Sequence, residues 1–225
     1  MKKSKKLLCP HCGQTIKPAF HFCPQCGLHL VENQPVLNLL NALDQQRRGQ
    51  AWKALEELKE LARLFPKNAH VHKLLGNQYF HLGQLDWAIF SYLRAIDLDH
   101  EYIDAYYDLG VAYYYRGSIK KATEAYQKVL QLNPAYHAAH YRIALCYYHS
   151  GQLNVAAQHF QQTIASTPEY VMAHYHLGVI YYKLGNYEKA VDEFKQVLKE
   201  NPDDVASAKY LKMITEASDQ KLVLE

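Results

Sequence analysis

The sequence predicts an all-α protein in which helical hairpins of 34 residues stack on one another, preceded by a short cysteine-rich module. Three columns of residues recur with this step. Glycines stand at positions 49, 83, 117, 151 and 185, alanines at 54, 88, 122, 156 and 190, and prolines at 66, 134, 168 and 202. His100 takes the one vacant place in the proline column. Because three independent columns keep the same phase, we take the 34-residue unit as the building block of the fold.

Residues 103–136 illustrate why each unit is a pair of helices. Apolar and small residues recur there at the i, i+3, i+4 and i+7 spacing of a helix, with a break at Gly117 and a stop at Pro134. One hairpin cannot bury the stripes of both helices, so neighbouring hairpins must stack to cover them. The two stripes are Tyr106, Leu109, Gly110 and Tyr113, followed by Ala122, Tyr126 and Val129.

These motifs resemble the tetratricopeptide repeat (TPR), which has the same period. The resemblance implies a right-handed superhelix, an α-solenoid, of about five hairpins plus a capping helix. His72, His140 and His174 depart from the family, which usually has a large aromatic residue at that position. The first helices carry His72-x2-Leu75-Gly76-x2-Tyr79, Tyr106-x2-Leu109-Gly110-x2-Tyr113, His140-x2-Ile143-Ala144-x2-Tyr147 and His174-x2-Leu177-Gly178-x2-Tyr181; the second carry Ala88-x3-Tyr92, Ala122-x3-Tyr126, Ala156-x3-Phe160 and Ala190-x3-Phe194.

The repeat register also predicts how the chain is divided. A repeat that lacks the first-helix motif comes first, and we expect it either to cap the stack or to dock on another surface, since Leu37, Leu39, Leu40 and Leu43 exceed one apolar stripe. The predicted parts are a basic tail at 1–6, a zinc ribbon at 7–30, a linker at 31–34, the degenerate or capping repeat at 35–68, regular repeats at 69–102, 103–136, 137–170 and 171–204, a C-terminal capping helix at 205–217 and a tail at 218–225.

The zinc ribbon is predicted from four of the five cysteines. They form two C-x-x-C pairs, Cys9 with Cys12 and Cys23 with Cys26, and this pattern places four thiolates around a tetrahedral Zn²⁺. Because protein ligands fill all four positions, the zinc would be structural and would supply most of the folding free energy of this module. The segment resembles a zinc-ribbon module common at the ends of bacterial proteins. The fifth cysteine, Cys146, is expected to be a buried, inert thiol.

The alternative to zinc is a pair of disulfides in a secreted module. Only Leu7 and Leu8 follow the basic start before Cys9, which is too short for the apolar region of a signal peptide. We therefore expect reduced cysteines and a cytoplasmic protein. No run of 18 apolar residues occurs, so no membrane span is expected.

The TPR resemblance also implies where a partner would bind. In that family, fixed positions of the first helices face a concave groove. Val111, Leu145 and Val179 take one such position, where the family usually has asparagine, so we expect the groove to accept a hydrophobic peptide or an amphipathic helix. The implied groove residues are Lys73, Asn77, Phe80, Tyr107, Val111, Tyr114, Tyr141, Leu145, Tyr148, Met172, Tyr175, Val179 and Tyr182.

One variant of the family clamps a C-terminal carboxylate with lysine, asparagine and arginine. Lys73, Asn77 and Arg142 match three of its five positions. Asp108 and Ala138 hold the other two, and Asp108 would repel a carboxylate. We therefore do not expect a carboxylate clamp here.

The expected function is that of a non-catalytic adaptor or scaffold that binds a protein segment. Two contact surfaces would also permit self-assembly into a homo-oligomer, and the architecture is similar to that of the magnetosome-associated scaffolds of this family. An enzyme is not expected, because the sequence has no phosphate loop, nucleophile elbow or open metal site. The alternative is a nucleic-acid-associated factor that uses the zinc ribbon and Lys2–Lys6. The net charge of +3 and the single Lys17 within the ribbon make nucleic acid a less suitable partner.

Overall fold

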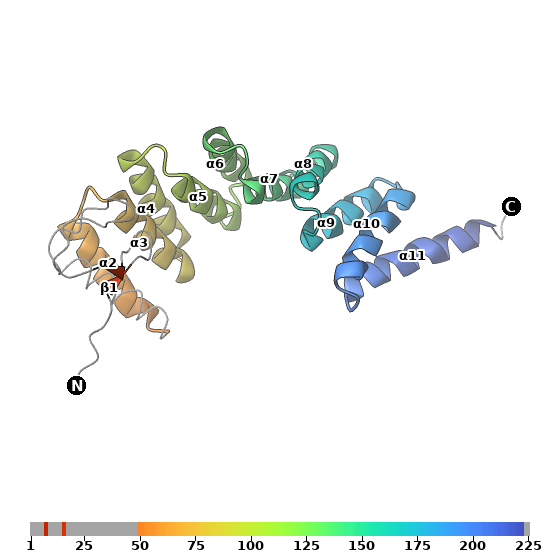
Figure 1. The fold of residues 1–225 in the computed structure, drawn as a ribbon, viewed down its shortest axis with the longest axis horizontal. Coiled ribbons are helices and arrows are strands. Elements are labelled where there is room, and N and C mark those ends of the chain that lie inside the picture. Colours follow the sequence, from red (N-terminus) through yellow and green to blue (C-terminus); the bar gives the residue numbers. More distant parts are fainter. Residues whose placement is uncertain (1–6, 9–14, 17–48, 223–225) are drawn as a thin grey trace. The chain divides into compact units, whose positions relative to one another are not determined.

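Ten α-helices, labelled α2 to α11, make up nearly all of the chain that the structure describes, together with one two-stranded sheet (Figure 1). The structure is a computed structural model and describes residues 7–8, 15–16 and 49–222. The chain divides into two compact units, residues 1–116 and 117–225. The predicted all-α class, with helices packed pairwise as hairpins, is confirmed.

The first unit contains four of these helices. They are α2 (Ala51–Leu64), α3 (Ala69–His81), α4 (Leu85–Leu98) and α5 (Ile103–Tyr115). Helices α3 and α4 form a hairpin, α2 packs against α3, and α5 packs against both helices of the hairpin. Helix α2 is the second helix of the degenerate repeat. The first helix predicted for that repeat and the 31–34 linker lie outside the described residues.

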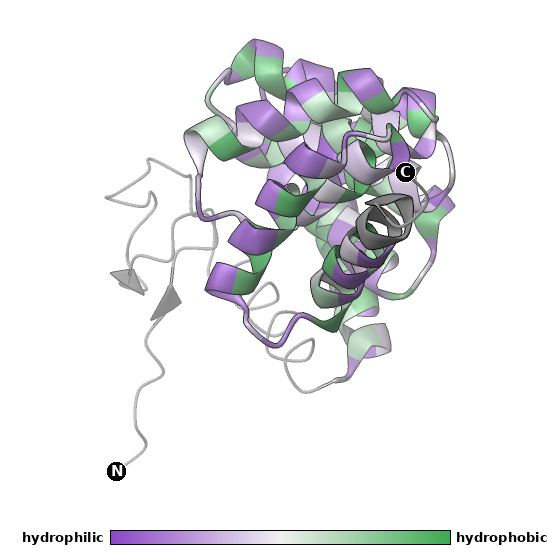
Figure 2. Ribbon diagram, turned by 90° about the vertical axis from the view of Figure 1, so that its right-hand side faces the viewer, coloured by the Kyte–Doolittle hydropathy of each residue, from purple (hydrophilic) through white to green (hydrophobic). Residues whose placement is uncertain are grey.

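The second unit contains six helices. They are α6 (Ile119–Leu132), α7 (His137–His149), α8 (Leu153–Ser166), α9 (Val171–Lys183), α10 (Tyr187–Glu200) and α11 (Val205–Leu222). Helices α7 and α8 form one hairpin and α9 and α10 form another, and from α7 onward each helix packs against its predecessor. Figure 2 shows that hydrophobic and hydrophilic residues alternate along the helices, as expected where only one side is buried.

A glycine in the left-handed region closes the turn of each of the three described hairpins, α3–α4, α7–α8 and α9–α10. Gly83 has φ +73°, and the other four glycines of the column lie between +72° and +81°. The Gly83 N–H donates to the Phe80 carbonyl and the Gln84 N–H to the Tyr79 carbonyl, both at 2.9 Å. This pair of bonds is the Schellman motif, which satisfies carbonyls at the helix end and requires a residue with positive φ. The same two bonds recur at residues 151–152 and 185–186.

Large aromatic residues of the second helices fill the core opposite small residues of the first. Tyr92, Phe160 and Phe194 are fully buried, as is Tyr126. A Cβ added to Gly76 would lie 2.5 Å from a Tyr92 ring carbon, and one added to Gly178 would lie 2.9 Å from a Phe194 ring carbon. At these two positions the first helix approaches the second so closely that only glycine fits without a shift of the ring.

Substitution of Gly76 by alanine is expected to destabilise the protein by about 1–3 kcal/mol, because the new methyl group overpacks the core. The Tyr92 ring is restrained from moving aside, since its Oη contacts the Asn77 amide at 2.8 Å. The ring of Phe194 has no hydroxyl to anchor it, so the control Gly178→Ala is expected to cost less. Urea unfolding followed by circular dichroism would measure both, and an equal cost at the two sites would contradict this account.

The C-terminal helix α11 covers the end of the second unit. Its start is capped by Asp204, whose Oδ2 accepts from the Ser207 N–H at 2.8 Å. Tyr210 stacks on Phe194 with ring centres 4.8 Å apart and an angle of 5° between the planes. The helix continues to Leu222, whereas the sequence predicts an end near residue 217.

The two strands lie in the cysteine-rich segment. Strand β1 (Leu7–Leu8) pairs antiparallel with β2 (Thr15–Ile16), with Leu8 opposite Thr15. Residues 9–14, which contain Cys9 and Cys12, lie between the two strands in the sequence and outside the described residues.

Candidate functional site

The predicted groove residues all lie on the first helices of the repeats. In the first unit they belong to α3 and α5, and in the second unit to α7 and α9. On α9 they form one stripe at the i, i+3, i+7 and i+10 spacing of a helix: Met172, Tyr175, Val179 and Tyr182.

The exposure of the predicted groove residues in the second unit differs from the expectation that Leu145 and Val179 face a partner. Met172 is 48% exposed, and Tyr148, Tyr175 and Tyr182 are half-buried. Leu145 and Val179, in contrast, are buried, as is Tyr141. Val179 packs with Phe194 and with Ile214 of the C-terminal helix, so its surface is used within the protein. These three residues offer a partner little surface, and the remaining ones present mainly tyrosine rings and a methionine.

Contacts to neighbouring side chains fix the aromatic rings of the second unit. Lys183 Nζ donates to Tyr148 Oη at 2.8 Å and lies 4.6 Å from the centre of the same ring. The Tyr182 ring meets the edge of Tyr210, with centres 5.1 Å apart. Rings held in this way lose little conformational entropy when a partner covers them, which favours binding.

In the first unit, a polar network occupies the predicted site. Lys73 Nζ lies 3.0 Å from Asp108 Oδ2. With its nitrogen turned toward Asp108, the Asn77 amide donates to Asp108 Oδ2 at 3.1 Å and accepts from Lys73 Nζ at 3.2 Å. Burial raises the pKa of Asp108, and the adjacent Lys73 opposes that rise. Asp108 thus already pairs with the lysine that a carboxylate clamp would use, and Arg142 belongs to the other unit.

Aromatic side chains lie on the same two helices as this network. The Phe80 ring meets Tyr115 edge to face with centres 5.6 Å apart, and Tyr115 meets Tyr114 at 5.7 Å. Tyr115 is exposed, while Phe80, Tyr107, Val111 and Tyr114 are half-buried. The first unit therefore combines the Lys73–Asp108 ion pair with partly accessible aromatic rings.

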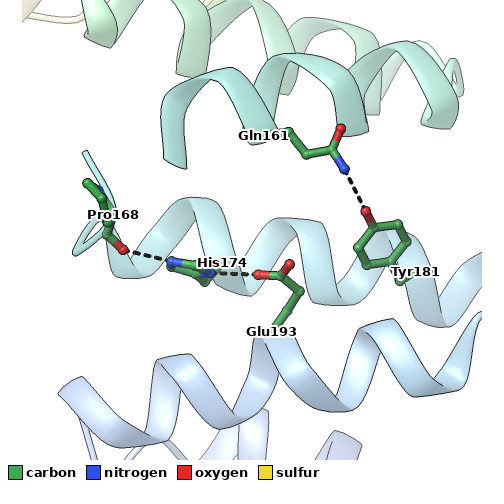
Figure 3. A network of polar contacts seen from close by, with 5 residues as sticks. All are labelled: Gln161, Pro168, His174, Tyr181 and Glu193. Carbon is green, nitrogen blue, oxygen red and sulfur yellow. Dashed lines mark hydrogen bonds and ion pairs between the residues drawn. The ribbon is translucent and has the colours of Figure 1, made fainter. Parts of the chain in front are cut away.

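The structure gives a reason for two of the histidines that depart from the family motif. His174 Nε2 lies 2.8 Å from the Pro168 carbonyl and its Nδ1 lies 2.6 Å from Glu193 Oε2 (Figure 3). His72 Nε2 likewise lies 3.0 Å from the Pro66 carbonyl. Each histidine thus links the first helix of its repeat to the proline that ends the preceding repeat. Sequence reasoning missed this contact, although the fixed spacing of six residues between proline and histidine could have indicated it.

A second feature not predicted from the sequence is a pocket of about 710 Å³ in the first unit. It lies between the α2–α3 turn and the α4–α5 turn, and His70 Nδ1 lies 2.7 Å from Tyr102 Oη at its side. Lys67, Asp99 and Glu101 contribute charges of both signs to its lining. The lining thus combines these charges with apolar side chains such as Leu64 and Phe65.

His176 is held in an apolar environment in the second unit. Its ring stacks on Phe160 with centres 5.4 Å apart and meets Tyr141 and Tyr148 at 6.0 Å. Burial lowers the pKa of His176 to about 4, and His149 adds to this shift. The imidazole is therefore neutral in the folded protein at neutral pH.

This pKa predicts a loss of stability on acidification. An unfolded chain takes up a proton at His176 near its ordinary pKa of about 6.5, whereas the folded chain does so only near pH 4, so folding becomes less favourable as pH falls through this window. Between pH 7 and pH 4 this effect should lower the free energy of unfolding of the wild type by on the order of 2 kcal/mol, and we expect the His176→Phe variant not to show it. Burial also lowers the pKa of His159, so the measured quantity is the difference between wild type and variant in urea unfolding at each pH. Parallel pH profiles for the two proteins would contradict the prediction.

The four predicted zinc ligands, Cys9, Cys12, Cys23 and Cys26, lie outside the described residues. Four thiols in two C-x-x-C pairs form a donor set that suits Zn²⁺. Elsewhere, within residues 49–222, no group of three or more histidine, cysteine or acidic side chains could hold a metal ion. Cys146 is buried, and this burial raises the pKa of its thiol.

Family comparisons agree with this arrangement. A TPR repeat model matches residues 76–115 and 144–185, and a tetratricopeptide repeat model matches residues 103–136 and 171–204. Together these matches cover more than half of the 225-residue chain. A zinc-ribbon domain model matches residues 8–30. No curated protein matches the chain.

Several solved structures have a similar fold. A crystal structure of MamA has a TM-score of 0.69 and 27% sequence identity, and the match covers 73% of this chain and 96% of MamA. MamA from Desulfovibrio magneticus RS-1, from residue 41 to its end, has a TM-score of 0.71 and 23% identity, with 77% and 98% covered. YrrB, described as a TPR protein with an unusual peptide-binding site, has a TM-score of 0.68 and 22% identity, with 80% and 94% covered. The last two likenesses concern the fold alone. Among the described residues, no helix is both long and apolar enough to cross a membrane.

Proposed function

The chain belongs to the tetratricopeptide-repeat family, and we propose that it is a non-catalytic adaptor or scaffold whose first helices bind a hydrophobic or amphipathic segment of another protein. Repeats of this family serve protein–protein interaction. The observation that carries the proposal is the α9 stripe, in which Met172 is exposed and the tyrosine rings of Tyr175 and Tyr182 are partly exposed.

The chemistry of this stripe favours an apolar partner. Tyrosine and methionine side chains provide large apolar area, and methionine adapts to partners of different shape. The predicted groove residues of the second unit are all uncharged, and the neighbouring Lys183 already donates to the hydroxyl of one of them, Tyr148. An amphipathic helix would place residues at i, i+3, i+4 and i+7 against such a stripe. A peptide-binding site is also described for the structurally similar YrrB.

The first unit would contribute polarity rather than net charge. Because Asp108 already neutralises Lys73, a peptide carboxylate placed there would have to displace an existing ion pair. We therefore propose that internal segments, not free C-terminal carboxylates, are the preferred ligands.

Zinc binding by Cys9, Cys12, Cys23 and Cys26 is the second part of the proposal. A metal held by four thiolates supplies structural stability and has no open position for a substrate. Thiolate ligands require reduced cysteines, which fits the proposed cytoplasmic location. The ribbon would thus be a folded module beside the repeats.

The groove proposal can be tested with peptides selected by display against the intact zinc-loaded protein. We expect the selected peptides to carry apolar residues at helical spacing, and Met172→Asp to weaken their binding by about tenfold or more, since a charge replaces the most exposed apolar side chain of the stripe. Met213→Asp is the matched control, because Met213 is 40% exposed on α11, whereas Met172 is 48% exposed on α9. Fluorescence polarisation would measure the affinities.

Two outcomes would overturn this proposal. One is an affinity unchanged by Met172→Asp while circular dichroism shows both variants folded. The other is selection of peptides that are uniformly charged or that bind only through their C-terminal carboxylate, which amidation of the peptide would reveal.

A further inference from the structure

Helix α4 has an outward face that is apolar although it is not buried. Trp87 is 58% exposed, Phe90 is 62% exposed and Leu93 is also exposed. They follow one another at i, i+3 and i+6, so they form a continuous stripe on one side of the helix, here called the α4 stripe. The opposite side of α4 provides its buried residues, which include Ala88, Tyr92 and Ala95.

The other second helices show that this stripe is not required by the fold. Eleven of the twelve residues that occupy the equivalent positions in α2, α6, α8 and α10 are charged or polar. Exposed apolar side chains that gather on one helix mark an interaction surface, whereas single ones are ordinary. The equivalent residues are Lys53, Glu56 and Lys59; Lys121, Glu124 and Gln127; Val155, Gln158 and Gln161; and Lys189, Asp192 and Lys195.

The α4 stripe is also held in a fixed arrangement. The Trp87 ring stacks on the buried Tyr79, with centres 6.0 Å apart and planes 26° apart. The Phe90 ring meets Trp87 edge to face, with centres 6.2 Å apart. A partner would therefore meet an anchor whose rings are already ordered, which lowers the entropic cost of binding.

Charges at the two ends of the stripe make it complementary to itself. Asp86 lies four residues before Phe90 and Arg94 lies four residues after it, so both share the same side of α4. If two copies of α4 cross antiparallel at Phe90, Asp86 of each faces Arg94 of the other, and Trp87 faces Leu93. A parallel crossing would place like charges opposite each other.

We propose that the α4 stripe is a docking surface for a second copy of this chain, with the two α4 helices antiparallel and Phe90 at the two-fold axis. Such an isologous contact closes on itself and gives a dimer. Within each chain Asp86 pairs with Arg116 at 2.8 Å and Arg94 with Asp97 at 3.8 Å. Exposed pairs of this kind contribute little, so they can exchange for pairs between the copies.

The expected dimer is weak. Three side chains of one helix bury far less than the roughly 800 Å² per partner of a standard interface. Dimerisation should therefore depend on protein concentration, with a dissociation constant in the micromolar range or above. This inference is independent of the peptide-binding proposal, because it involves a different helix and a different face.

The proposed register can be tested by charge reversal in the full-length protein, followed by sedimentation velocity over a concentration series. Asp86→Arg alone places two arginines opposite each other, and Arg94→Asp alone places two aspartates opposite each other, so each variant should dimerise less than wild type. An equimolar mixture of the two variants restores both opposite-charge pairs and should form a heterodimer. A mixture that stays monomeric, with helicity retained, would overturn the antiparallel register.

The occupant of the stripe can be tested by fluorescence, because the chain has two tryptophans, Trp52 and Trp87. In the Trp52→Phe variant, Trp87 is the remaining tryptophan and reports on the stripe. The same variant is the control for the loss of an exposed tryptophan, because Trp52 is 60% exposed on α2. We expect Trp87 emission to shift to shorter wavelength as concentration rises and the dimer forms. Three results would overturn the proposal: emission at short wavelength in the monomer, which would show that the chain covers its own stripe; no association at any concentration; or dimerisation that survives Trp87→Ala with Phe90→Ala.

Discussion

Replacement of Phe160 by alanine is expected to lower the free energy of unfolding by about 3–5 kcal/mol. The Phe160 side chain is fully buried, with Tyr141 against its edge at 5.6 Å and His176 stacked on its face at 5.4 Å. Truncation removes the ring that lies between α7 and α9 and leaves a cavity that these neighbours can fill only in part. Urea unfolding monitored by circular dichroism would measure the loss.

The matched control is Phe160→Tyr. The equivalent positions of two other repeats are Tyr92 and Tyr126, so a tyrosine ring fits this place in the repeat. We expect this variant to lose much less stability than Phe160→Ala. In Phe160→Ala the His176 ring also loses its stacking partner, so its pKa should rise from about 4 toward the ordinary value. A cost below about 1 kcal/mol for Phe160→Ala would show that this ring is not central to the core.

Removal of zinc is expected to abolish the fold of the cysteine-rich module and leave the repeats folded. The proposed site binds about one zinc ion per chain, and metal binding of this kind contributes about 10–16 kcal/mol to the folding of small zinc modules. The described helices begin at Ala51 and carry their own buried residues, so their circular dichroism should persist in a chelator. Metal analysis together with limited proteolysis would separate the two effects.

Single substitutions sharpen this test. Cys23→Ser should lose stoichiometric zinc and expose the module to protease, whereas Cys146→Ser should keep the zinc, because Cys146 is buried within α7. Zinc retained after Cys23→Ser, or no zinc bound by the fully reduced wild type, would contradict the proposed ligand set. Collapse of the repeats on chelation would show that the two parts do not fold separately.

The sequence predicts the parts of this fold that depend on local geometry. The glycine column indicates left-handed turns, and these glycines have positive φ. The motif spacing correctly predicts helical hairpins, because a small residue in the first helix permits close approach of the second, as at Gly76 and Gly178.

The parts that escaped prediction depend on what packs against a given residue. Repeat position places Leu145 and Val179 toward the groove, but burial is decided by neighbours such as Ile214, which belongs to no repeat motif. The hydrogen bond between His174 and the Pro168 carbonyl was likewise not predicted, since the family motif has an aromatic residue at the position of His174. The significance of Trp87 and Phe90 emerges only when exposure is compared across equivalent helices.

The Schellman turns have a consequence for how such a chain can evolve. At Gly83, Gly151 and Gly185 the bonds that end the first helix join residues no more than five apart. No helix end at these turns depends on a distant segment for its termination. Duplication or deletion of a whole hairpin would therefore leave every surviving turn intact, and the number of hairpins can drift between lineages while the local architecture persists.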